Sequence, residues 1–181
     1  MPDHTGSVTT PAGTTSPHAT GQASATAGGT VSPREQAAER LSRLLAQSVT
    51  DRTSIVAAVA DVNSCGPTLT TDPQTLENAA LSRQNLLKEL ASLSGRNALP
   101  QNLLAALTGA WQNSMQADQD YAKWAQDELS GGCTTNDAAD PNYKAALGPD
   151  GRATTDKKAF ASDWQPIGTE YGLPVYQWNQ L

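Results

Sequence analysis

The chain has 181 residues and a formal net charge of −6 at pH 7, a length that suits one domain with a flexible segment attached. Because the excess charge is negative and Lys and Arg form no block, the composition argues against a nucleic-acid partner and against binding to an anionic membrane surface. No apolar run approaches the roughly 18 residues that a membrane span needs, and no signal peptide is recognisable at the start of the sequence.

Residues 1–31 consist mainly of Thr, Ser, Ala, Gly and Pro, with Asp3 as the single charged residue. The segment has no hydrophobic periodicity, so it cannot bury enough apolar surface to offset the entropy cost of ordering its backbone. We therefore expect a disordered linker over residues 1–31, followed by a folded domain over residues 32–181.

Two helices are expected before residue 96. Ser32-Pro33-Arg34-Glu35 is a helix start, with Ser as N-cap, Pro at the first position and an acid in the first turn. From there apolar residues return every three or four positions as far as Asn63, and Cys65-Gly66-Pro67 ends the pattern. A second pattern begins at Asp72-Pro73 and closes at Gly95.

The strongest helical pattern lies between Leu99 and Cys133. Large or apolar residues recur at helical spacing for about eight turns, starting after Pro100 and stopping at Gly131-Gly132. The loops before this helix are short, so consecutive helices are expected to be antiparallel neighbours.

The remainder predicts a divided fourth helix. Asp140-Pro141 starts a short helix that ends at Gly148, residues 149–151 form a turn, and a fourth helix begins at Thr154 or Thr155, with a kink or break at Pro166. This helix would span about 25 Å, against roughly 40–45 Å for the first and third. Residues 173–181 alternate large apolar residues in an extended register, and we expect this tail to cover the groove that a short fourth helix leaves open.

These elements predict an all-α, up-down four-helix bundle with an extended C-terminal tail packed on it. Its first and third helices run parallel, so Cys65 and Cys133 would lie at the same end and could form a disulfide. The alternative is two reduced thiols in a cytosolic protein. A zinc site is less expected, because the sequence has no further Cys and residues 32–181 have no His.

Three charged residues occupy core positions of different helices: Arg52, Arg83 and Asp118. Counted back from the cysteines, Arg52 and Asp118 lie at about one depth, roughly 20 Å below the disulfide, and Arg83 can reach a similar level. The functional interpretation is a ligand or anion pocket inside the bundle. There are two structural alternatives. The three residues could form a polar layer that sets the register of the helices, or they could lie at the margins of the apolar helix faces, where their charged groups reach water.

Other chemistry has weaker support. The sequence contains no G-x-S-x-G, P-loop or Rossmann glycine pattern and no Glu-x-x-His pair, so we expect no catalytic residue, cofactor or metal. The late aromatic residues are expected to anchor the C-terminal segment to the core: Trp164, Tyr171, Tyr176 and Trp178. Four acids could in principle supply oxygen ligands to Ca²⁺, but their spacing favours solvated side chains: Asp137, Asp140, Asp150 and Asp156.

Four short segments carry a resemblance to a known group of proteins. They are Cys65-Gly66-Pro67, Gly132-Cys133-Thr134, Ala122-Lys123-Trp124-Ala125-Gln126-Asp127 and the ending from Tyr171-Gly172-Leu173-Pro174 to Leu181. Together they resemble uncharacterised extracytoplasmic helical domains of actinobacterial envelope proteins, over roughly residues 33 to 181. In that group a membrane segment and a linker usually precede the domain. The resemblance implies a helical fold outside the cytoplasm and no particular activity.

The sequence thus leads to three functional hypotheses. The first is a non-catalytic, extracytoplasmic binding or interaction module of the cell envelope, secreted or tethered by a segment absent from this sequence, with an unknown protein or small-molecule partner. The second is a small-molecule-sensing bundle with its ligand near Arg52, Arg83 and Asp118. The third is a hydrolase that uses carboxylates between residues 133 and 156. A cytoplasmic location is the alternative to the extracytoplasmic one.

Overall fold

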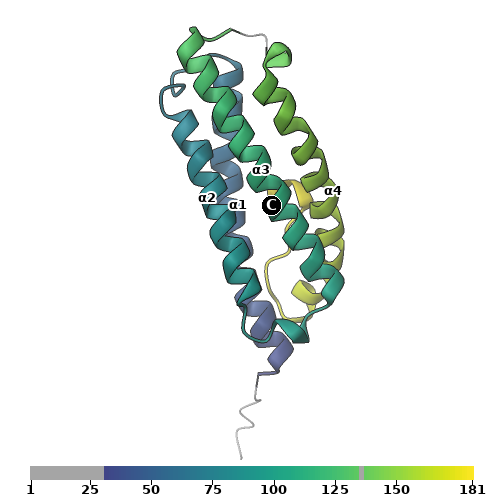
Figure 1. The fold of residues 1–181 in the computed structure, drawn as a ribbon. Helices are drawn as coiled ribbons and strands as arrows, with labels where there is room; N and C mark the ends of the chain where they lie inside the picture. Colours follow the sequence, from purple (N-terminus) through teal and green to yellow (C-terminus); the bar gives the residue numbers. More distant parts are fainter. Residues whose placement is uncertain (1–30, 135–136) are drawn as a thin grey trace, which may run out of the picture. The chain divides into compact units, whose positions relative to one another are not determined.

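The structure, a computed structural model, describes residues 31–134 and 137–181, so the linker prediction for residues 1–31 lies outside the described residues except for Val31. Four long helices alternate in direction (Figure 1). They are α1 (Pro33–Asn63), α2 (Asp72–Ala91), α3 (Gln101–Gly131) and α4 (Pro141–Glu170), joined by the 3-10 turns η1 (Arg96–Ala98) and η2 (Asp137–Ala139), with η3 (Trp178–Gln180) near the end. The predicted all-α up-down bundle is confirmed. None of the helices described is long and apolar enough to cross a membrane.

The predicted helix starts at Ser32 and Asp140 are confirmed at atomic detail. The Ser32 hydroxyl accepts a hydrogen bond from the Glu35 backbone at 3.1 Å, and the Glu35 carboxylate accepts one from the Ser32 backbone at 3.4 Å. Asp140 accepts from the backbone N–H groups of Asn142 and Tyr143, at 2.7 and 2.9 Å. Both starts satisfy N–H groups that have no partner inside the helix. At α2 the cap is Thr71, without a side-chain bond, and Asp72 is the first helical residue.

The prediction of a divided fourth helix is wrong. One continuous helix, α4, runs from Pro141 to Glu170 through both Pro149 and Pro166. Each proline removes one backbone donor, and the carbonyls affected belong to the residues four positions earlier, Ala145 and Ser162. Both of these residues are exposed, so water can replace the lost hydrogen bonds. The helix is therefore as long as its neighbours, and the argument from a short fourth helix fails.

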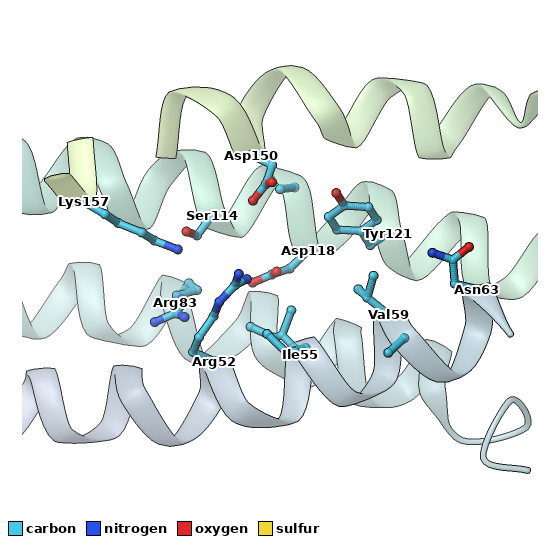
Figure 2. Close-up of a pocket in the computed structure, with 13 residues that line it drawn as sticks. Arg52, Ile55, Val59, Asn63, Arg83, Ser114, Asp118, Tyr121, Asp150 and Lys157 are labelled. Carbon is cyan, nitrogen blue, oxygen red and sulfur yellow. The ribbon is translucent and has the colours of Figure 1, made fainter. Parts of the chain in front are cut away.

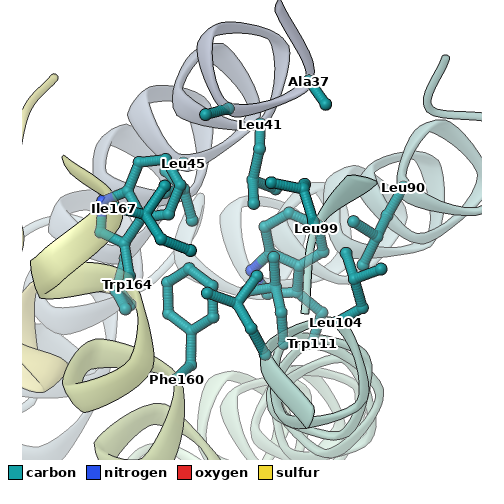
Figure 3. Packing of buried hydrophobic residues seen from close by; sticks show 14 of the residues in the cluster. Ala37, Leu41, Leu45, Leu90, Leu99, Leu104, Trp111, Phe160, Trp164 and Ile167 are labelled. Atoms are coloured by element: carbon teal, nitrogen blue, oxygen red, sulfur yellow. The ribbon is translucent and has the colours of Figure 1, made fainter. Parts of the chain in front are cut away.

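The hydrophobic core is divided into two clusters. The larger one contains three big aromatic side chains, Trp111, Phe160 and Trp164, packed among leucines of α1, α2 and α3 (Figure 3). The second lies toward the disulfide and includes Trp124, whose ring meets Tyr121 and Tyr143 edge-on. Buried polar residues, among them Arg83, Asp118 and Lys157, lie on the helices at the level between the clusters.

The C-terminal tail lies in the seam between α1 and α4, which make hardly any direct contact with each other. Leu181 is only 1% exposed and joins the larger cluster, and the Trp164 indole donates to the Pro174 carbonyl at 2.9 Å. The tail is packed on the bundle as predicted. It fills a gap between two long helices, however, and not a groove left open by a short fourth helix. Trp178 differs from the expected anchor: it is 39% exposed, with the Lys158 ammonium 4.7 Å from its ring centroid.

The predicted disulfide between Cys65 and Cys133 is confirmed. It joins the ends of α1 and α3 with a Cα–Cα distance of 5.8 Å. Each cysteine has a left-handed backbone conformation, with φ of 52° at Cys65 and 47° at Cys133. Both therefore occupy the position just beyond a helix end where a positive φ reverses the chain.

Candidate functional site: a charged pocket between α1 and α4

On the disulfide side of the tail, the seam between α1 and α4 opens into a cavity of about 340 Å³, called here the α1–α4 pocket (Figure 2). All four helices contribute to its wall. It is lined by Arg52, Ile55, Val56, Val59, Ala60 and Asn63 of α1, Arg83 of α2, Ser114, Ala117, Asp118 and Tyr121 of α3, and Asp150 and Lys157 of α4. The pocket exists because α1 and α4 make hardly any direct contact with each other and the tail fills only the other part of the seam.

The structure brings the three predicted site residues to this one pocket. Arg83 is fully buried, Asp118 is 4% exposed and Arg52 is half-buried. Arg52, Asp118 and Arg83 do not form a direct ion-pair triad. Among the described residues, no ion pair closer than 4.0 Å involves any of the three.

Arg83 is held by Ser48 of α1. Its guanidinium donates to the Ser48 hydroxyl and, at 3.4 Å, to the Ser48 carbonyl. The Trp111 indole donates to the same hydroxyl at 3.1 Å, which fixes the serine between two donors. Burial lowers the pKa of Arg83, and the Coulomb attraction of Asp118 and Asp51 opposes this effect. Arg83 is therefore a rigid, buried cation beside the pocket.

Asp118 is the counterpart in the same layer, and it is incompletely satisfied. Its Oδ2 atom is buried without a hydrogen-bond partner, as are Nε of Arg52 and Nε of Arg83. Burial raises the pKa of the Asp118 carboxyl from 3.8 to about 7, against the attraction of Arg83, Lys157 and Arg52. Buried polar atoms without partners are uncommon in folded proteins and cost stability, so a layer built for packing alone would be expected to pair them.

The sequence reasoning missed a third cation, Lys157. Its side chain is 5% exposed and extends toward the pocket from α4 (Figure 2). Burial, together with the nearby positive charges of Arg83 and Arg52, lowers its pKa from 10.5 to about 7. Asp150, which also lines the pocket, was named in the sequence only as a loop acid.

A signal for both residues was present in the sequence. Asp150, Ala153, Lys157, Phe160 and Trp164 are spaced by three or four residues, so they continue one face of a helix. The turn expected at residues 149–151 separated Asp150 from that face, and only the continuity of α4 restores it. Lys157 lay inside the predicted fourth helix, three residues before Phe160, and its place on the buried face was overlooked.

The pocket has an excess of positive charge. Arg52, Arg83 and Lys157 face two carboxylates, those of Asp118 and Asp150. Because Arg83, Asp118 and Lys157 are buried, their charges act through a lower effective dielectric than they would in water. The arrangement therefore favours an anion over a cation as an occupant.

The acids proposed for calcium binding or hydrolysis are not gathered into one site. Asp140 caps α4, Asp150 lines the pocket, and Asp156 accepts from the Asn113 side chain at 3.0 Å. Asp137 lies in η2. Across residues 31–134 and 137–181, no cluster of three His, Cys, Asp or Glu side chains is arranged to hold a metal ion.

Comparison of the chain with protein-family models, with curated proteins and with solved structures gives no match. The resemblance to actinobacterial envelope domains therefore stays a prediction from the sequence. Any functional assignment has to come from the pocket itself: its position in the seam, its buried charges and its incomplete hydrogen bonding.

Proposed function

We propose that this bundle is a non-catalytic binding domain that takes up a small anionic ligand in the α1–α4 pocket. The observation that carries the proposal is the convergence of three cationic side chains, from α1, α2 and α4, on one cavity of about 340 Å³. This volume lies within the range of small-molecule sites. This function corresponds to the second hypothesis drawn from the sequence, a bundle that binds a small molecule near Arg52, Arg83 and Asp118. It shares with the first hypothesis the broader idea of a binding module.

The main alternative is a polar layer that only sets the register of the helices. Such a layer stabilises a bundle best when its charges are paired and the space around them is filled. Here the Nε donors of Arg52 and Arg83 are buried beside the cavity without a protein acceptor, and an anion could accept from them, which supports a role for the layer in binding. An anion would add a counter-charge to a site in which cations outnumber carboxylates.

We also propose that the domain works outside the cytoplasm. The support is the Cys65–Cys133 disulfide, because such bonds persist in oxidising compartments and are rare in the cytosol. Protein taken directly from its native cells, with thiols blocked at lysis, is expected to run as the oxidised form on a non-reducing gel. A fully reduced population would contradict this location.

Binding can be tested by titrating isotope-labelled oxidised protein with sodium acetate and following its amide signals by NMR. At constant ionic strength, we expect saturable shifts around Arg52, Asp118 and Lys157. Tetramethylammonium chloride should give none, because a cation does not complement the pocket.

Two variants complete the test. Lys157→Met removes one pocket cation with little change in side-chain volume and should abolish the acetate shifts. Lys144→Met, an equal change of charge at an exposed site of α4, should leave them unchanged. Non-saturable shifts, or equal binding by both variants, would contradict the proposed function.

A further inference from the structure

We infer that the ligand is an amphiphilic monocarboxylate, with its carboxylate beside Arg52 and Lys157 and its apolar chain along α1 toward Asn63. This inference rests on the proposed function, and it adds the chemical class of the ligand and its orientation.

The pocket is elongated along α1. Its residues on this helix recur at positions 52, 55, 56, 59, 60 and 63, which is one continuous face. The eleven helical steps from Arg52 to Asn63, at 1.5 Å each, make this face roughly 16 Å long. A compact inorganic anion would occupy only one end of it.

The two ends differ in chemistry. Lys157, Arg83 and Arg52 lie at one end, whereas Val59 and Asn63 lie at the other (Figure 2). The wall between them is formed by Ile55, Val56, Val59 and Ala60 of α1, with Ala117 and Tyr121 of α3. Val56 is 49% exposed although it borders the cavity, so a ligand chain lying there would remove apolar surface from water.

The charges favour a single negative group. Arg52, Arg83 and Lys157 outnumber Asp118 and Asp150 by one, so a monoanion balances the site. A second negative group further along the ligand would approach Asp150 and then an apolar wall. A planar carboxylate also suits the fork of donors that an arginine presents.

Proton uptake should accompany binding. The titratable and charged groups that face the pocket are Arg52 from α1, Arg83 from α2, Asp118 and Tyr121 from α3, and Asp150 and Lys157 from α4. Asp118 and Lys157 both have a pKa of about 7 in the unliganded protein, whereas burial raises the pKa of Tyr121 to about 12. An incoming carboxylate disfavours the ionised form of Asp118 and favours the protonated form of Lys157. We therefore expect affinity to be about tenfold higher at pH 6 than at pH 8.

The test is a series of straight-chain carboxylates, from acetate through butyrate and hexanoate to octanoate, measured by calorimetry and NMR. A fully buried methylene contributes about fourfold in affinity, so in this half-open groove affinity should rise about two- to fourfold per methylene. Octylamine should bind far more weakly than octanoate, because the head site is cationic. 2-Aminooctanoate should bind no better than octanoate.

Paired variants locate the chain of the ligand. Val56→Asn should weaken octanoate at least threefold and leave acetate unchanged. Leu81→Asn, at an exposed position of α2 outside the pocket, should change neither. Both sites are exposed, so both variants are expected to fold, and circular dichroism checks this.

The outcomes of these experiments distinguish a failure of the inferred ligand class from a failure of the proposed anion-binding function. If acetate binds but affinity does not rise with chain length, the amphiphile is wrong and anion binding stands. If 2-aminooctanoate binds better than octanoate, the ligand is a zwitterion and the inference is overturned. If no carboxylate binds saturably, both proposals fail.

Discussion

Replacing both cysteines by serine should destabilise the bundle strongly. The disulfide links residues 68 apart in sequence, and the chain-entropy model for a loop of this length gives about 4 kcal/mol of stabilisation. For a domain of this size each kcal/mol shifts the melting temperature by about 2–4 °C, so Cys65→Ser/Cys133→Ser should melt about 8–16 °C below the oxidised protein. Reduction of the native protein should produce a similar loss.

A second pair of substitutions separates the cross-link from the backbone conformation. Cys65 and Cys133 have φ of 52° and 47°, a region that costs an L-residue about 1–2 kcal/mol. Serine has the same conformational cost at both sites, whereas glycine adopts a positive φ without it. Glycine, however, loses more backbone entropy on folding, which destabilises the protein by about 0.5–1 kcal/mol at each position. Cys65→Gly/Cys133→Gly should therefore be about 1 kcal/mol more stable than the serine pair.

Thermal and urea unfolding of the four forms (oxidised, reduced, serine pair and glycine pair) measure these differences directly. A serine pair that melts within 2 °C of the oxidised protein would refute the stabilising role of the disulfide. A glycine pair less stable than the serine pair would refute the backbone argument alone.

Three further predictions concern the tail and the pocket. Deletion of Tyr176–Leu181 removes a buried leucine from the core and should lower the free energy of unfolding by about 2–4 kcal/mol; an unchanged melting temperature would reject the packed tail. Ser48→Ala removes the hydroxyl that accepts from both the Arg83 guanidinium and the Trp111 indole and should cost about 3 kcal/mol in urea unfolding, and a neutral effect would contradict this network. Because the folded-state pKa of Asp118 is about 7 and its ordinary value is 3.8, the native state binds this proton more tightly than the unfolded chain, so stability should fall as pH rises from 4 to 7. The difference corresponds to at most about 4 kcal/mol, and Asp118→Asn should remove this contribution to the decline; parallel pH profiles for both proteins would refute it.

Local signals in the sequence determined the elements and much of the site. Ser32-Pro33 and Asp140-Pro141 specify helix starts through backbone N–H groups that need partners within three residues, so they can be recognised without tertiary information. The order of four antiparallel helices then placed Cys65 beside Cys133. The same counting along helices placed Arg52, Arg83 and Asp118 at one level, because rise per residue is constant.

Only the tertiary structure decided the course of α4 and the shape of the pocket. A proline weakens a helix locally, but the cost at Pro149 is outweighed when Ala146, Pro149 and Ala153 are buried and the freed carbonyl of Ala145 faces water. That balance depends on the neighbouring helices and cannot be read from the turn residues around it. With α4 continuous, Asp150 lies on the same helix face as Lys157 and lines the pocket, and the unfilled part of the α1–α4 seam becomes a cavity, because the width of the seam is set by the packing of all four helices together.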